Sequence, residues 1–134
     1  MPHLTIDYTR NLDAACDMGA LCQTLAAELV AMRNDENGPL FPLTGTRVLA
    51  RPAVYFAVAD GQQDKGFIYM NLRMAPGRSD SVKKRVGDQL LAKALAVLEP
   101  VFSHHALGLT LHIDDAAPAF DGKLNNLTAP VPAL

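Results

Sequence analysis

The sequence predicts an α+β fold of two β-α-β units that form one mixed sheet with two helices on one face. Several short segments alternate apolar and polar residues, which is typical of half-buried strands. Two longer segments carry apolar residues at steps of three and four, which is typical of amphipathic helices. The order strand, helix, strand occurs over residues 2–58 and again over residues 66–114. Because a helix between two strands suggests a right-handed crossover, the two units can share one sheet.

The first unit begins with a strand over residues 2–8, in which Leu4, Ile6 and Tyr8 alternate with polar residues. A helix is expected from Ala14 to Arg33, with Asn11 or Asp13 as its N-cap. Its apolar stripe consists of Met18, Leu21, Leu25, Leu29 and Met32. Charged and turn-forming residues over 34–39 then predict a solvated loop.

The end of the first unit is less regular. Residues 46–51 could form a short strand that stops at Pro52. Residues 53–59 are a stronger strand candidate because they are rich in Val, Tyr and Phe. Asp60 and Gly61 then open a turn that extends through Gln63 to Asp64.

The second unit has the clearest strand, over residues 67–74, and another over residues 107–114. The first of these places Ile68, Met70, Leu72 and Met74 on one face. Between the strands we expect a helix that is capped by Ser79 or Asp80 and ends or kinks near Pro100. Its predicted buried stripe is Val82, Val86, Leu90, Ala94 and Val97. From Ala116 onward the proline-rich tail should be irregular.

Composition excludes several classes of protein. A chain of 134 residues with 49% hydrophobic residues is expected to be a single domain, residues 1–134, with a packed core. A formal net charge of −2 argues against nucleic-acid binding. No apolar run reaches the roughly 18 residues of a membrane span, and the N-terminal segment lacks the features of a signal peptide. We therefore expect a cytoplasmic protein that binds neither nucleic acid nor a membrane.

The cysteines and histidines do not indicate a metal site. Cys16 and Cys22 are six residues apart, which places them on different faces of a helix, so we expect buried free thiols. The four histidines lack the spacing of a zinc site. The chain also has no glycine-rich phosphate loop and no G-x-S-x-G motif. We expect neither a metal nor a cofactor.

The predicted strands are apolar on much of both sides. The sheet face without helices should therefore be covered as well, and an oligomer is the simplest cover.

The most informative position for chemistry is Pro2. If Met1 is removed, the new amino terminus is the secondary amine of Pro2, which the following strand holds rigidly. Such an amine can act as a general base. Proline is also common at this position in proteins that make no use of it, and Pro2 could simply open an edge strand. The rest of the chain must decide between these interpretations.

Arg78 stands just ahead of the second predicted helix. A helix N-terminus presents free N–H groups and a positive dipole end, and an arginine adds a fork that fits a carboxylate. Lys83, Lys84 and Arg85 in the first turns indicate either the same anion site or a solvated basic face.

Arg47, at the start of a predicted strand, is unremarkable alone. We interpret His3, His104, His105, Asp7 and Asp114 as structural or solvated.

Taken together, several short motifs resemble the 5-carboxymethyl-2-hydroxymuconate isomerase family of the tautomerase superfamily, which includes 4-oxalocrotonate tautomerase and macrophage migration inhibitory factor. The resemblance extends from Pro2 to about Asn126. It rests on the N-terminal Pro2 and on residues 41–47 (FPLTGTR), 59–64 (ADGQQD), 76–79 (PGRS) and 123–126 (KLNN). Each motif is short, and their order and spacing are what make the resemblance specific.

The resemblance implies a cofactor-independent isomerase that forms a homotrimer with sites between subunits. It assigns Pro2 as the catalytic base and Arg47 and Arg78 as the residues that bind the carboxylates of a small anionic substrate. The implied reaction is ketonisation of 5-carboxymethyl-2-hydroxymuconate in homoprotocatechuate catabolism. Two alternatives stay open: a tautomerase for another small enol, and a non-catalytic trimeric binding protein of the same fold.

Overall fold

The computed structural model describes residues 1–62 and 64–133, so Gln63 of the predicted turn lies outside the described residues. In these ranges the chain forms two long helices and four strands. The order is β1 (His3–Thr9), α1 (Met18–Ala31), β2 (Arg47–Ala53), β3 (Lys65–Arg73), α2 (Asp80–Phe102) and β4 (Ala106–Asp114). Short 3-10 turns follow β1 and precede β2, at Arg10–Leu12 and Leu43–Gly45.

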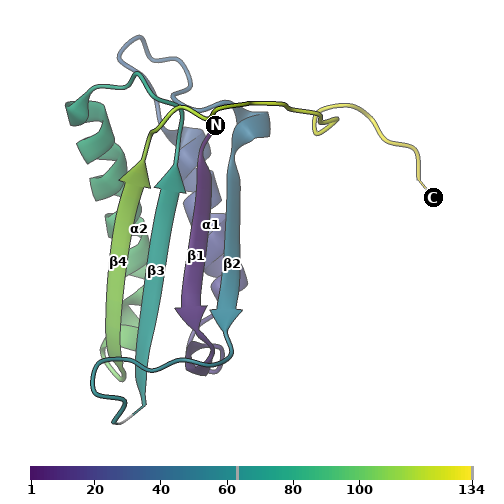
Figure 1. Cartoon of the computed structure of the whole chain (residues 1–134). Helices are drawn as coiled ribbons and strands as arrows, with labels where there is room; N and C mark the ends of the chain where they lie inside the picture. Colours follow the sequence, from purple (N-terminus) through teal and green to yellow (C-terminus); the bar gives the residue numbers. More distant parts are fainter. Residues whose placement is uncertain (63, 134) are drawn as a thin grey trace.

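The four strands form one sheet in the order β2-β1-β3-β4. Within each unit the strands are parallel, β1 with β2 and β3 with β4. The two units meet along β1 and β3, which are antiparallel. Both helices lie on the same face of the sheet, behind it in Figure 1. The predicted fold of two β-α-β units in one mixed sheet is confirmed.

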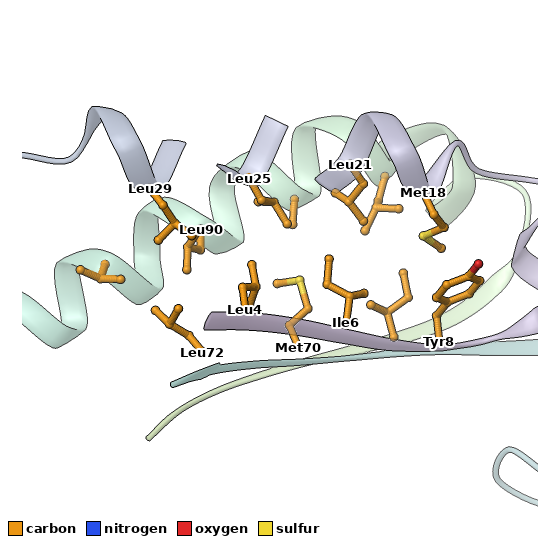
Figure 2. Close-up of a cluster of buried hydrophobic side chains, with 14 of the residues drawn as sticks. Leu4, Ile6, Tyr8, Met18, Leu21, Leu25, Leu29, Met70, Leu72 and Leu90 are labelled. Carbon is orange, nitrogen blue, oxygen red and sulfur yellow. The ribbon is translucent and has the colours of Figure 1, made fainter. Parts of the chain in front are cut away.

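The core fills the space between the sheet and the helices. Figure 2 shows Leu4, Ile6, Met70 and Leu72 pointing from the sheet toward leucines of the helices. The predicted stripe of α1 is confirmed, because all five of its residues are buried. In α2, Val86, Leu90 and Ala94 are buried as predicted, but Val82 and Val97 are only half-buried. Val82 lies in the first turn, and beyond Ala94 the stripe continues by a step of four to Leu98. Burying each large aliphatic side chain contributes about 1.5–3 kcal/mol relative to exposure.

Helix α1 begins later than predicted. Its N-cap is Asp17, whose carboxylate accepts a hydrogen bond from the backbone N–H of Ala20 at 2.9 Å. The predicted caps have other partners: Asn11 donates to the Lys65 carbonyl, and Asp13 accepts from the Tyr8 hydroxyl at 2.6 Å. The prediction was wrong here because both side chains are occupied by contacts that hold the 3-10 turn to neighbouring elements.

The strand predicted over residues 53–59 does not form. Strand β2 instead runs from Arg47 through Pro52 to Ala53, and the residues after it are bends and turns. A proline is tolerated in β2 because this is an edge strand, where a backbone N–H can be missing without loss of a ladder bond. The following segment cannot pair in the same way, since it must pass β1 to reach β3, as the connection below the sheet in Figure 1 shows.

The second face of the sheet is more polar than predicted. It presents Thr5 and Asp7 on β1, with Arg51, Tyr69, Asn71, His112 and Asp114 on the other strands. Asp7 forms an ion pair with Arg51 at 3.2 Å, and Asp114 accepts a hydrogen bond from Asn71 at 2.7 Å. The alternation along the strands therefore separates an apolar face from a polar face, which we call the open face.

Ser79 caps α2, as predicted, by accepting from the Val82 N–H. Pro100 lies within the last turn of α2, which ends at Phe102. After Asp114 the described chain, up to residue 133, has no further helix or strand. No helix among the described residues is long and apolar enough to span a membrane.

Candidate active site

Pro2 lies at the start of β1 and is buried, while Met1 before it is partly exposed. The Pro2 carbonyl accepts a hydrogen bond from the backbone N–H of Arg47 at 3.0 Å. This bond extends the parallel pairing of β1 and β2, so the chain end is fixed beside the first residue of β2. With Met1 present, the Pro2 nitrogen is part of an amide and has no basicity.

Arg47 is held by the turn before it. Its guanidinium donates to the Thr44 carbonyl at 3.2 Å, and its backbone lies opposite His3 in the register of the two strands. Because partners in register point to the same side of a sheet, Arg47 and His3 both lie on the open face.

Arg78 is fixed in the segment between β3 and α2, directly before the Ser79 cap. Its guanidinium donates to the carbonyls of Ala75 and Leu40, both at 3.0 Å. It also lies over the ring of the buried Phe41, 4.8 Å from the ring centroid, which is cation–π geometry. Burial lowers the pKa of Arg78 without neutralising it near pH 7.

Several of these charges act on the chain terminus and on the adjacent His3. Burial lowers the pKa of the Met1 amine, and the positive charges of Arg78 and Lys123 lower it further, while Asp121 opposes them. The pKa of His3 is lowered first by burial, then by Arg47, by the terminal amine and by Arg73. The structure brings Pro2, Arg47 and Arg78 to the same end of the sheet.

A hollow of about 580 Å³ opens beside the terminus. One wall comes from the start of β1 and the end of β3, with Met1, His3 and Arg73. The other wall comes from the tail after β4, with Asp121 and Lys123. Figure 1 shows this tail passing close to the N-terminus. Arg47 and Arg78 do not line the hollow itself.

Within the described part of the chain, the arginines at this end have no carboxylate partner. Among the described residues, the ion pairs of the structure do not include Arg47, Arg73 or Arg78. Cations that are held in place by backbone carbonyls and lack an acid partner can accept an anionic ligand with little rearrangement. This end of the sheet is therefore a candidate anion site next to the chain terminus.

The basic residues in the first turns of α2 differ. Lys83 pairs with Asp80 at 3.3 Å and Asp115 at 3.1 Å, and Lys84 pairs with Asp88 at 2.6 Å. Arg85 donates to the Arg33 carbonyl at 3.0 Å. Because these three residues already have partners, they fit the interpretation as a solvated basic face better than the interpretation as an anion site.

Sequence reasoning missed three residues that the structure places here, namely Phe41, Arg73 and Lys123. Arg73 ends the alternating strand β3, so its face could have been assigned from the period. Phe41 and Lys123 belong to irregular segments, where no periodicity indicates which way a side chain points.

Within the part of the chain that the structure describes, no group of three or more His, Cys, Asp or Glu residues could hold a metal ion. Cys16 and Cys22 are free and half-buried rather than fully buried as predicted. Burial raises the pKa of both thiols, which makes them poor nucleophiles at pH 7.

Two β-α-β units in one mixed sheet, with a candidate anion site at the chain terminus, are the features of a tautomerase-like protein. Comparison with known proteins specifies the family. The family model "5-carboxymethyl-2-hydroxymuconate isomerase" matches residues 2–131, so the chain belongs to this isomerase family.

Individual relatives agree with this assignment. A 5-carboxymethyl-2-hydroxymuconate Delta-isomerase of Escherichia coli is 26% identical over 129 residues, which are 96% of this chain and 98% of the relative. A crystal structure of a 5-carboxymethyl-2-hydroxymuconate delta-isomerase is 46% identical, with a TM-score of 0.92 over 96% of this chain and 91% of that chain. A 5-carboxymethyl-2-hydroxymuconate isomerase from Deinococcus radiodurans R1 is 32% identical, with a TM-score of 0.81 over 94% and 90%.

A more distant structure shares the fold alone. A fused 4-OT protein described as a symmetric trimer is 17% identical, with a TM-score of 0.61, over 87% of this chain and 88% of that chain.

Proposed function

We propose that this chain, once Met1 is removed, catalyses the ketonisation of 5-carboxymethyl-2-hydroxymuconate in homoprotocatechuate catabolism. The observation that carries this proposal is the position of the chain terminus beside Arg78 and Arg47, neither of which has a carboxylate partner among the described residues. Family membership and the 26–46% identical relatives support the choice of substrate.

In the proposed reaction the Pro2 amine is the general base. It removes the proton of the 2-hydroxy group of the dienol and returns a proton to a carbon of the chain, so the reaction needs no cofactor. A base works best when its pKa is near the operating pH. The Met1 amine already has a lowered pKa because of burial and Arg78. In the processed chain we expect the same two causes to act on the Pro2 amine, since Pro2 is more buried than Met1.

Removal of Met1 also creates space. A Cβ atom placed on Gly45 would lie 2.7 Å from the Met1 sulfur, so the Met1 side chain packs directly against this glycine. In the processed chain this volume, between Pro2 and the turn before β2, becomes available to substrate. Met1 thus blocks the proposed site in two ways, by amide formation and by occupancy.

Arg47 and Arg78 are proposed to bind two carboxylates of the substrate. The same positive charges stabilise the dienolate as it forms, and such electrostatic stabilisation is strongest when the donors are held in place beforehand. The backbone carbonyls that fix both guanidinium groups supply this preorganisation. We further propose a cytoplasmic homotrimer, in which the open face of each sheet is covered by a neighbouring subunit.

The experiment compares two forms of the chain, one that starts at Pro2 (checked by intact mass) and one with an uncleaved N-terminal extension. Ultraviolet absorbance follows the dienol band of 5-carboxymethyl-2-hydroxymuconate. We expect the extended form to be slower by about 10²–10⁴-fold, which is the usual contribution of a general base.

Equal rates for the two forms would exclude the Pro2 amine as the base. If the processed form does not act on this compound but acts on smaller enols, the chain is a tautomerase with another substrate. No turnover of any enol, with an intact trimer, would indicate a binding protein.

A further inference from the structure

The hollow beside the terminus contains cations that the proposed reaction does not use. Arg73, the last residue of β3, lies on one wall, and Lys123 of the tail lies on the other. The two come from segments that are distant in sequence, and the return of the tail past the start of β1 brings them together. Neither is needed to bind the two carboxylates assigned to Arg47 and Arg78.

We propose that Arg73 and Lys123 form a subsite for a third carboxylate, so that the site selects tricarboxylates over dicarboxylates. This inference rests on the function proposed above and adds the residues that determine its substrate class. It assigns Lys123 and Arg73 as specificity-determining residues, while Pro2, Arg47 and Arg78 carry the chemistry common to both kinds of substrate.

The balance of charge supports a third anionic group. The residues that line the hollow include two cations, Arg73 and Lys123, and one carboxylate, Asp121, while Asp114, opposite Arg73 in the register of β3 and β4, accepts a hydrogen bond from Asn71. A dicarboxylate bound by Arg47 and Arg78 would therefore leave a net positive charge in the lining of the hollow. Because the hollow is partly withdrawn from water, a third carboxylate would reduce this repulsion more than it would at a flat surface.

Lys123 has a partner that an incoming carboxylate can replace. It forms an ion pair with Asp121, two residues earlier in the same tail, and the Lys123 side chain is 41% exposed. Exposed ion pairs of this kind contribute little to stability, so exchanging Asp121 for a substrate carboxylate has a small energetic penalty. Asp121 thus occupies the position that we assign to the third carboxylate.

The kinetic test uses the chain that starts at Pro2 and compares 5-carboxymethyl-2-hydroxymuconate with 2-hydroxymuconate, the dienol without the carboxymethyl group. For Lys123→Ala and Arg73→Ala, we expect the ratio of kcat/KM for the tricarboxylate to that for the dicarboxylate to fall about tenfold or more. The matched control is Lys84→Ala, because Lys84 also pairs with a nearby aspartate but lies on α2. This control should leave the ratio unchanged.

A binding test does not depend on turnover. Calorimetry with tricarballylate and with glutarate, which differ by one carboxylate, measures the preference of the processed chain for three anionic groups. We expect tighter binding of tricarballylate, loss of this preference in Lys123→Ala, and a larger preference in Asp121→Asn. Asp121→Asn should increase the preference because it removes the carboxylate that competes with the ligand for Lys123.

The outcomes separate the two proposals. Turnover by the wild-type chain with an unchanged ratio in Lys123→Ala and Arg73→Ala would overturn the subsite and leave the proposed function standing. Equal losses on both substrates would also overturn it, since that result indicates a general electrostatic effect. Absence of turnover, together with equal affinity for tricarballylate and glutarate, would overturn both.

Discussion

The two faces of this sheet carry different kinds of residue, although the same strands make both. The face toward the helices is apolar, and Leu4, Ile6, Met70 and Leu72 on it are essentially inaccessible to water. The open face carries hydroxyl, amide and charged side chains, with few large apolar groups. Packing of the chain on itself therefore depends on one face, and the other face is available for binding and assembly.

A second difference runs along the open face. At the far end from the terminus, Arg51 is paired with Asp7. At the end that contains Pro2, Arg47 and Arg73 have no carboxylate partner among the described residues. An exposed pair such as Arg51 and Asp7 contributes little to stability. What the comparison teaches concerns charge: the arginines that could bind an anion are those at the Pro2 end, on which the proposed site rests.

The largest expected effect is a difference in stability between substitutions on the two faces. Leu72→Ala, at a fully buried position on β3, should lower the free energy of unfolding by about 2–5 kcal/mol. Leu49→Ala, at a position 60% exposed on the open face of β2, should change it by about 0.5 kcal/mol or less. Urea unfolding measures both. If the loss of unfolding free energy in Leu49→Ala grows with protein concentration, this position belongs to a subunit interface. Losses that are equal in the two variants and independent of concentration would contradict the distinction between the two faces.

The next effect compares the two ends of the open face. Arg47→Ala removes a cation of the proposed site, and Arg51→Ala removes a paired arginine of the same strand. We expect kcat/KM on 5-carboxymethyl-2-hydroxymuconate to fall about 10–100-fold for the first, as for a lost hydrogen bond to a charged group. The second should change it less than about threefold. Similar losses in the two variants would show that the proposed site is not confined to one end.

The pH dependence of kcat/KM sharpens the role of Arg78. The base must be neutral, so activity should rise with pH through the pKa of the Pro2 amine. Burial and neighbouring cations lower the pKa of an amine, so this rise should lie below the ordinary value of about 8. Arg78→Ala removes one of these cations and should move the rise to higher pH. A shift to lower pH, or none, would show that Arg78 does not act on the base.

The smallest expected effect is a change in the pH dependence of stability, and it concerns Tyr8 on the buried face. Burial and the hydrogen bond to Asp13 raise the pKa of Tyr8 to about 12, against an ordinary value of 10.0. The native chain then keeps a proton that the unfolded chain releases, so stability is present below pH 10 and falls as pH rises toward 12. Tyr8→Phe should reduce this fall, which urea unfolding near pH 9 and pH 11 measures. An identical pH dependence in the variant would contradict this assignment.

The sequence by itself determined the repeated order of elements and most of the core. Local periodicity records which side of a strand or helix is buried, so the stripe of α1 and the inward residues of β3 could be read without a structure. Arg78 could also be singled out, because its position before a helix cap is a local feature. Pro2 could be singled out as well, because removal of Met1 would leave its secondary amine as the chain terminus. Arg47 received its proposed role from the resemblance to a family, and the structure adds its proximity to Pro2.

Only the tertiary structure decided which segment became β2 and which residues surround the terminus. Residues 53–59 are the stronger strand candidate by composition, but pairing with β1 selects residues 47–53 because the later segment must cross to β3. Arg73 and Lys123 are 50 residues apart in the sequence, and they line one hollow because the tail returns past the start of β1. Contacts of this kind depend on the path of the whole chain, which no local pattern records.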